Sequence, residues 1–204
     1  DLADTATMAH LLKYDSVHGK LSETISHNDD FLIVNDTKIE FLHEKDITKL
    51  NWKPFDLDFV IEATGKHKTA DLLQNHIKNG AKRVILSVPP DDNEIKTVVL
   101  GVNESILNGS ELIVSNASCT TNNAAPMVKI IDELCGLDKA FITTVHSYTT
   151  DQSLHDQPHK DLRRARGAAQ SIIPTTTGAA KSLTKIFPEF EGKIGGGGIR
   201  VPVP

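Results

Sequence analysis

Long apolar runs, surplus basic charge and cysteine are all scarce in this 204-residue chain. No apolar stretch approaches the roughly 20 residues that span a bilayer, and no charged, apolar and cleavable leader opens the sequence. We therefore expect a soluble, cytoplasmic protein with no membrane partner. The formal net charge is -5 and basic residues are dispersed, apart from a short cluster at 163–166. No basic surface for nucleic acid is expected from this distribution.

Only two cysteines are present, Cys119 and Cys135. If one unbroken helix carries both, they lie about 24 Å apart at ~1.5 Å rise per residue, which is too far for a disulfide. No partner stands at a finger-like spacing from either cysteine. His155 and His159 have the spacing of a zinc-binding helix, but Pro158 between them breaks helical geometry. We predict loop residues there and no metal site.

The first half of the chain alternates apolar runs with helical patterns. A helix is predicted over 4–14 and a hairpin over 31–42, with Asn35 and Asp36 at its turn. Runs rich in Val, Ile and Leu at 58–65, 83–88, 97–100 and 112–115 predict strands, and 69–79 predicts a helix between the first two. Continuous runs of this kind are typical of parallel strands covered on both faces.

The second half has a different pattern. A long β-branched strand is predicted over 139–149 and another strand over 195–203, separated by a polar loop over about 150–167. A helix carrying Leu183, Ile186 and Phe187 is expected to stop at Pro188. We place the domain boundary near Ser118, which divides the chain into residues 1–118 and 119–204.

Cys119 lies where a strand has just ended and a helix begins, with Ser118 as the predicted N-cap. A helix N-terminus presents unpaired N–H groups and partial positive charge, so it favours a thiolate and could hold an oxyanion. The neighbouring Ser, Thr, Thr and Asn side chains form a poor apolar pocket, which favours a functional thiol over a buried structural one. Pro126 predicts a kink, or a regular helix that starts after Cys119.

Two further residues bear on this thiol. Cys135 follows Ile130, Ile131 and Leu134 on an apolar face and is predicted to belong to the core. His146 lies 27 residues after Cys119, near the end of the predicted strand. A returning strand could place its imidazole beside the thiol and form an activating Cys-His pair. A histidine in a strand is also common as a hydrogen-bonded structural residue, and the spacing alone leaves both interpretations open.

Five ordered motifs in the second half resemble glyceraldehyde-3-phosphate dehydrogenases. They are SCTTN at 118–122, TTVH at 143–146, HKDLRRARG at 159–167, IIPTTTGAAK at 172–181 and RVP at 200–202. LKYDS at 12–16 and EATG at 62–65 are similar to the cofactor domain of that family, so the resemblance covers the whole chain. It implies an incomplete α/β Rossmann-like NAD-binding domain followed by an incomplete α+β catalytic domain with a mainly antiparallel sheet.

The resemblance also implies an activity: NAD-dependent oxidative phosphorylation of glyceraldehyde 3-phosphate to 1,3-bisphosphoglycerate, in glycolysis and gluconeogenesis. Cys119 would attack the aldehyde to form a thiohemiacetal, hydride would pass to the nicotinamide, and inorganic phosphate would release the acyl group from the thioester. His146 would take the thiol proton and assist hydride departure. The complete protein would be a homotetramer.

The resemblance assigns two sets of binding residues. The substrate and phosphate set is Ser118, Thr120, Thr149, Thr177, Gly178 and Arg200, whose hydroxyl, amide and guanidinium groups suit phosphate oxygens. The cofactor set is Asp1, Lys45, Thr64, Gly65 and Ser87. Asp1 would bond the adenosine ribose, and its charge disfavours the extra phosphate of NADP. Lys45 and Gln157 stand where many relatives carry Arg and Leu, which leaves the cofactor preference less defined.

The family's glycine-rich turn does not occur in this sequence, and the chain stops within a predicted strand. We therefore expect a fragment that is inactive alone and poorly soluble, because it would expose sheet edges and apolar faces. Other functions remain open from the sequence. They are an erythrose-4-phosphate or NADP-preferring dehydrogenase, a non-catalytic assembly fragment, and a cysteine hydrolase, which would need no cofactor domain.

Overall fold

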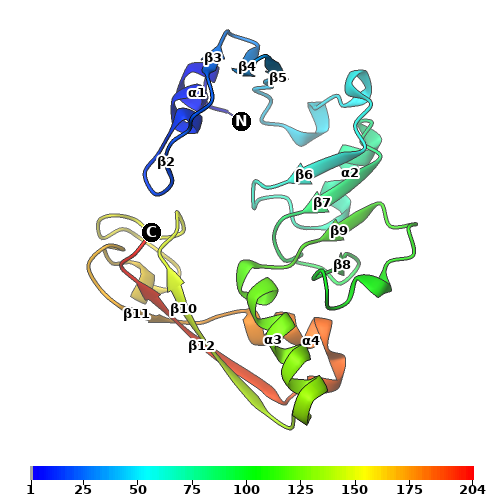
Figure 1. Cartoon of the computed structure of the whole chain (residues 1–204), viewed down its shortest axis with the longest axis vertical. Helices are drawn as coiled ribbons and strands as arrows, with labels where there is room; N and C mark the ends of the chain where they lie inside the picture. The colour runs from blue at the N-terminus through cyan, green and yellow to red at the C-terminus, as the bar shows by residue number, and fades with distance from the viewer. Residues whose placement is uncertain (1) are drawn as a thin grey trace. The chain divides into compact units, whose positions relative to one another are not determined.

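The computed structural model describes residues 2–204, which form two compact units divided between Asn51 and Trp52 (Figure 1). Asp1, predicted to contact the cofactor, lies outside the described residues. The boundary near Ser118 is a prediction about the division between cofactor and catalytic domains, and it stays a prediction.

The first unit contains one helix and small antiparallel sheets. Helix α1 (Thr5–Lys13) is capped by the Asp4 side chain, which accepts a hydrogen bond from the Thr7 N–H. Strand β1 (Tyr14–Asp15) pairs with β2 (Gly19–Lys20), and β3 (Ile25–His27), β4 (Phe31–Val34) and β5 (Thr37–Glu40) form a three-stranded sheet. The predicted helix and hairpin are confirmed, and Asn35 at the turn has φ 53°. A 3-10 turn, η1 (Ile47–Lys49), follows.

The second unit begins with a four-stranded sheet. Its strands are β6 (Phe59–Glu62), β7 (Arg83–Leu86), β8 (Lys96–Thr97) and β9 (Ile113–Ser115), in the order β6-β7-β9-β8. Every pairing is parallel, as predicted. Helix α2 (Ala70–Lys78) connects β6 to β7, and the short turns η2 (Lys53–Phe55) and η3 (Glu104–Ile106) flank the strands.

The core of this sheet lies on the face that α2 covers, where Leu73 of α2 packs with Val84, Leu86 and Ile95. On β6 the expectation of two covered faces is wrong. Phe59 is 52% and Ile61 67% exposed, and they alternate with buried Val60 and Glu62. β6 is the edge strand of the sheet, and its outer face has no covering element among the described residues.

The remaining strands form a mixed sheet rather than the mainly antiparallel one expected. β10 (Ala140–Ser147), β11 (Ile173–Thr175) and β12 (Ile194–Val201) lie in the order β10-β12-β11. β12 pairs with β10 in parallel over eight residue pairs and with β11 antiparallel over three. Parallel strands need a crossover, which here includes η4 (Leu162–Arg164), β11, α4 (Ala179–Ile186) and η5 (Pro188–Phe190).

Helices α3 (Cys119–Cys135) and α4 pack together over the second core (Figure 1). That core includes Ala124, Ala125 and Val128 of α3 and Leu183 and Ile186 of α4. α3 runs from Cys119 continuously through Pro126, so of the two alternatives predicted from this proline the later start of the helix is wrong, and the kink stays a prediction.

The prediction that Cys135 belongs to the core is also wrong. Cys135 is exposed, as are Ile130, Ile131 and Leu134, the last at 80%. The helix buries the opposite stripe at 121, 124, 125 and 128 instead, which has the expected helical spacing. Within residues 2–204, none of the helices has the length and apolar character required to cross a bilayer.

Candidate active site

Cys119 is the first residue of α3, and the turn before it is fixed by hydrogen bonds. The Ser118 hydroxyl accepts from the Thr121 N–H at 3.1 Å and so caps the helix. Ala117 is buried with φ 58°, an uncommon left-handed conformation for a residue with a side chain. Its N–H donates to the Ser115 hydroxyl, which donates in turn to the Val88 carbonyl. Strained backbone held this firmly is often found at functional sites.

His146 faces this thiol, as the sequence predicted. Its Nε2 lies 3.5 Å from Cys119 Sγ, although the two residues belong to different elements. β10 pairs with β12 in a register that sets His146 opposite Arg200. The sheet therefore presents an imidazole and a guanidinium side by side, next to an exposed thiol at a helix N-terminus.

The second ring nitrogen of His146 has two close neighbours. Nδ1 lies 2.8 Å from the Arg200 Nη1 and 2.8 Å from the Ser147 carbonyl oxygen, and the same Nη1 donates to that carbonyl at 2.8 Å. A guanidinium can only donate, so its contact with Nδ1 requires the imidazole proton to be on Nε2. With the proton on Nδ1, the ring would donate to Ser147 and leave Nε2 free to accept.

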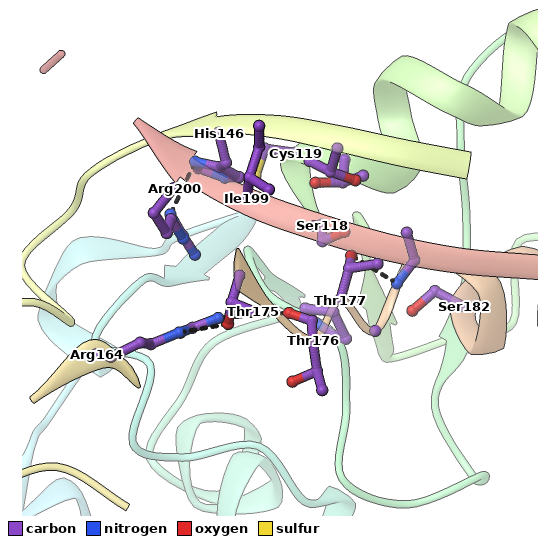
Figure 2. Close-up of a pocket in the computed structure, with 16 residues that line it drawn as sticks. Ser118, Cys119, His146, Arg164, Thr175, Thr176, Thr177, Ser182, Ile199 and Arg200 are labelled. Carbon is purple, nitrogen blue, oxygen red and sulfur yellow. Dashed lines mark hydrogen bonds between the residues drawn. The ribbon is translucent and has the colours of Figure 1, made fainter. Parts of the chain in front are cut away.

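Cys119 and His146 line a cavity of about 250 Å³ (Figure 2). Its walls come from the start of α3, the ends of β10, β11 and β12, η4 and the start of α4. Most of its side chains are hydroxyl-bearing or cationic: Ser118, Thr120, Thr144, Arg164, Thr175, Thr176, Thr177, Ser182 and Arg200. No carboxylate lines it among the described residues. This lining suits an anionic, oxygen-rich ligand.

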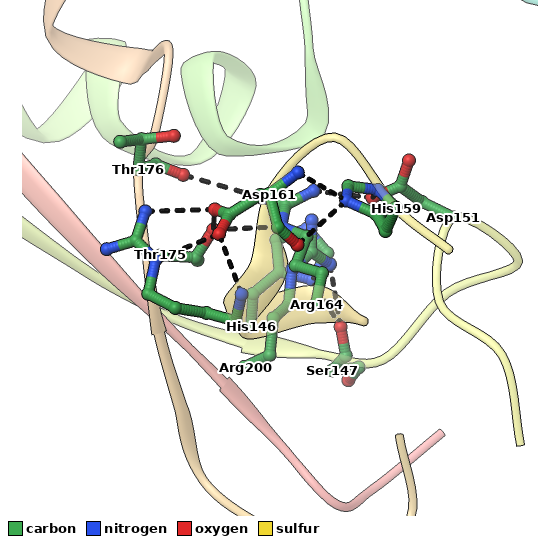
Figure 3. Close-up of polar contacts among 10 residues, drawn as sticks. His146, Ser147, Asp151, His159, Asp161, Arg164, Thr175, Thr176 and Arg200 are labelled. Atoms are coloured by element: carbon green, nitrogen blue, oxygen red, sulfur yellow. Dashed lines mark hydrogen bonds and ion pairs between the residues drawn. The ribbon is translucent and has the colours of Figure 1, made fainter. Parts of the chain in front are cut away.

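Arg164 reaches the cavity from η4 and is held on both sides (Figure 3). Its Nε donates to the Thr175 hydroxyl at 2.8 Å and its Nη1 pairs with Asp151. Asp151 also lies 3.4 Å from His159 Nε2. Burial raises the pKa of the Asp151 carboxyl, but the hydrogen bonds from Arg164 and His159 outweigh it and lower that pKa below its usual value. The aspartate thus stays ionised and fixes the guanidinium.

Arg200 is half-buried and less completely satisfied. Its Nε is buried with no hydrogen-bond partner within residues 2–204, and the same is true of the Thr144 hydroxyl. Burial, and then the positive charge of Arg164, lower the pKa of the Arg200 guanidinium. Two cations and two unpartnered polar atoms in one cavity are a costly arrangement. A bound anion would relieve it.

Most of the predicted site residues meet here. Ser118, Cys119, Thr120, His146, Thr177, Gly178 and Arg200 all line the cavity. Thr149 does not, because β10 ends at Ser147 and the chain turns so that the Thr149 carbonyl accepts from the Gln152 N–H. Its role in anion binding stays a prediction. Arg164 and Thr175 also line the cavity and were not among the predicted site residues, although both lie in motifs that resemble the family.

The predicted cofactor residues of the second unit lie at one edge of the parallel sheet. Thr64 and Gly65 follow β6 and Ser87 follows β7, and all three are exposed. A Cβ built on Gly65 would meet no atom within 4 Å. Small exposed residues at the carboxyl edge of parallel strands fit a dinucleotide. Lys45 is exposed in the first unit, just before η1. No cluster of metal-ligating side chains occurs in the part of the chain described.

Comparison with known proteins agrees with this geometry. Residues 118–204 match the sequence profile described as "Glyceraldehyde 3-phosphate dehydrogenase, C-terminal domain", and residues 1–70 match the one described as "Glyceraldehyde 3-phosphate dehydrogenase, NAD binding domain".

Individual relatives align over nearly the whole chain. Glyceraldehyde-3-phosphate dehydrogenase 2 of Bacillus subtilis is 50% identical over 199 residues, which are 97% of this chain and 58% of the relative. The glyceraldehyde-3-phosphate dehydrogenases of Mycolicibacterium smegmatis and Geobacillus stearothermophilus are each 48% identical over the full chain, covering 60% and 61% of their own lengths. The chain thus spans about three fifths of these relatives, and it belongs to the glyceraldehyde-3-phosphate dehydrogenase family.

Proposed function

We propose that the full-length protein containing this chain is an NAD-dependent, phosphorylating glyceraldehyde-3-phosphate dehydrogenase. It would convert glyceraldehyde 3-phosphate and inorganic phosphate to 1,3-bisphosphoglycerate. Assembly as a homotetramer and a cytoplasmic location belong to the same proposal and rest on the family resemblance. The observation that carries the proposal is the 3.5 Å approach of His146 Nε2 to Cys119 Sγ in a cavity lined by cations and hydroxyls.

The first step follows from this pair. His146 takes the thiol proton at Nε2, and the sulfur attacks the aldehyde carbon to form a thiohemiacetal. The new oxyanion lies next to the first turn of α3, whose backbone N–H groups have no partner within the helix and can stabilise it. The capped, strained turn at Ala117 and Ser118 keeps the sulfur at that position.

NAD, when bound, supplies the acceptor for the hydride that leaves the thiohemiacetal. Thr64, Gly65 and Ser87 at the carboxyl edge of β6 and β7 would hold it, together with the remainder of the cofactor domain. Inorganic phosphate then attacks the thioester carbonyl, the carbon-sulfur bond breaks, and Cys119 leaves as a thiolate. Arg164, Arg200 and the threonines at 175–177 supply donors for the phosphate groups.

Arg200 connects phosphate binding to the base. While its Nη1 donates to His146 Nδ1, the imidazole proton must be on Nε2, and that tautomer cannot accept the thiol proton. A substrate phosphate is a stronger acceptor for a guanidinium than a neutral ring nitrogen. Once Arg200 turns to the phosphate, Nδ1 can carry the proton and donate to the Ser147 carbonyl. Nε2 is then the base.

The test is an assay of the full-length protein. NADH formation from glyceraldehyde 3-phosphate should require phosphate or its analogue arsenate, and Cys119→Ser should abolish it. Parallel assays with erythrose 4-phosphate and with NADP separate the close relatives that the sequence left open. Absence of NADH formation with every sugar phosphate, in a folded preparation, would refute the proposal. Size-exclusion chromatography with light scattering tests the homotetramer.

A further inference from the structure

Beneath the carboxyl edge of β6 lies a buried polar network that the proposed chemistry does not use. Glu62, the last residue of β6, and His76 of α2 are each 3% exposed. The Glu62 Oε2 lies 3.2 Å from His76 Nε2. Its Oε1 accepts from the backbone N–H of Thr64 at 2.8 Å and from the Thr64 hydroxyl at 2.5 Å. Three donors thus converge on one buried carboxylate.

Trp52 fixes the direction of the hydrogen bonds in this network. Its indole N–H, which can only donate, lies 3.1 Å from His76 Nδ1. Nδ1 must therefore accept, and the imidazole proton is on Nε2, directed at Glu62. His76 is a neutral donor between an indole and a carboxylate. A buried charge is tolerated when its acceptor positions are filled in this way.

Glu62 also holds the neighbouring strand end. Its backbone carbonyl accepts from the Ser87 N–H at 3.0 Å, just after β7. One residue therefore ties down both Thr64 and Ser87, which lie exposed at the edge where the sheet would meet a dinucleotide. The Thr64 hydroxyl in turn accepts from the Lys66 N–H at 3.2 Å, which closes the turn around Gly65.

We infer that Glu62 is a positioning residue for cofactor binding. Its carboxylate, set by His76 and Trp52, holds the turn 64–66 in the conformation that would contact a bound dinucleotide. If this carboxylate served only to stabilise the sheet, its hydrogen bonds could all come from core residues. Instead, two of its three side-chain hydrogen bonds come from Thr64, which is exposed. The inference rests on the proposed function.

The experiment uses the full-length protein and calorimetric titration with NAD, which needs no turnover. Glu62→Gln should raise the NAD dissociation constant about tenfold, because the amide replaces one of the two carboxylate oxygens that accept from His76 and Thr64 with an N–H group. The kinetic loss should fall mainly on KM for NAD. Thr64→Val should give part of the same loss, and the double variant should lose less than the product of the two. His76→Gln keeps a donor and should bind NAD more tightly than His76→Leu.

Glu94→Gln, at an exposed carboxylate, is the matched control and should bind NAD like the wild type. A lower melting temperature in Glu62→Gln with an unchanged dissociation constant would mean a purely structural role and would overturn the inference. If Glu62→Gln does not fold, an unchanged dissociation constant in Thr64→Val overturns it. A wild-type protein that binds no NAD would instead count against the proposed function.

Discussion

At the residue scale, the two cysteines form an internal comparison, because both thiols are exposed. Cys119 starts a helix and faces an imidazole, whereas Cys135 ends the same helix and bonds the Ile131 carbonyl. With inorganic phosphate present to draw Arg200 away from His146 Nδ1, we expect iodoacetamide to alkylate Cys119 at least about tenfold faster than Cys135 at neutral pH, because the thiolate is the reacting form. Peptide mass spectrometry over time gives both rates.

His146→Asn is the control for that measurement. It should bring the Cys119 rate most of the way toward the Cys135 rate, because the proton acceptor is lost while the helix N-terminus remains. Equal rates at the two thiols in the wild type would remove the reason to assign nucleophilic chemistry to Cys119.

Arg200 gives a second prediction at this scale. Arg200→Met removes a half-buried cation with an unpartnered Nε from the cavity. A lost charged hydrogen bond is worth about 1.5–3 kcal/mol, so KM for the phosphorylated aldehyde should rise roughly tenfold to a hundredfold in steady-state kinetics. Arg163→Met is the matched control, because Arg163 pairs with Asp161 outside the cavity. An equal effect of both substitutions would contradict a specific role for Arg200.

The residues of the site were predictable to different degrees. Cys119 and His146 were found because a thiol at a strand-to-helix turn has chemical meaning and because the motifs around them resemble a family. Arg164 was missed, since a cluster of arginines does not indicate which guanidinium turns inward. That choice depends on Asp151 and Thr175, which lie 13 and 11 residues away. The Glu62, His76 and Trp52 contacts span 14 and 24 residues and have no local signal.

At the scale of elements, Gly80 lies just after helix α2 and packs against Lys53, the first residue of η2. It has φ +113°, and a Cβ built on it would lie 2.8 Å from the Lys53 backbone nitrogen. Gly80→Ala should therefore destabilise the protein by about 2–4 kcal/mol, through both backbone strain and overpacking. The free energy of unfolding in urea measures this.

Gly109→Ala separates the two causes. Gly109 has φ +89°, but nothing lies within 4 Å of its built Cβ. Its substitution should cost only the strain of about 1–2 kcal/mol. Equal losses at the two glycines would mean that the close approach of Lys53 contributes nothing.

Strand and helix positions were largely predictable, but the faces they bury were not. The predicted β6, β7, α2, β10 and β12 all form. On α3, the large apolar residues near Cys135 suggested a buried stripe, yet the core takes the small residues Ala124 and Ala125. Close packing of α3 against α4 favours small side chains, a constraint that depends on the tertiary partner and that hydrophobicity alone does not reveal.

At the scale of the whole molecule, the Glu62 carboxyl makes the free energy of unfolding depend on pH. Burial would raise the pKa of its carboxyl, but hydrogen bonds from His76 and Thr64 outweigh burial and lower the pKa from 4.5 to about 2. Because the folded-state pKa is the lower one, the stabilisation is present above about pH 4.5 and is lost as pH falls toward about 2. The shift corresponds to about 3 kcal/mol.

Melting temperatures of wild type and Glu62→Gln measure this contribution. The difference between them should shrink as pH is lowered from about 5 to about 3, because over this range the unfolded wild type takes up a proton at the Glu62 carboxyl and the folded protein does not. A difference that stays constant across this window would show that the Glu62 carboxyl does not titrate as described.

The exposed apolar side chains predict how these 204 residues behave alone. Leu134, Phe141, Val145 and Ile61 lie open on α3, β10 and β6, and surfaces of this kind drive association. We expect the isolated polypeptide to bind a hydrophobic dye and to sediment as concentration-dependent assemblies, whereas the full-length protein should show a single defined species. A monodisperse monomer of the isolated chain in analytical ultracentrifugation would contradict this.

The four consecutive glycines of β12 let this strand lie close to its neighbours. β12 is the middle strand of its sheet, and a methyl group at Gly195 or Gly196 would meet the Phe141 ring at 3.1 Å or the Ile142 carbonyl at 3.3 Å. A side chain at either position requires that neighbour to move by a few tenths of an ångström. A Cβ at Gly197 or Gly198 would meet its nearest atoms at an ordinary 3.7 Å or 3.5 Å, so the first two glycines of the run are the ones that tolerate a side chain least.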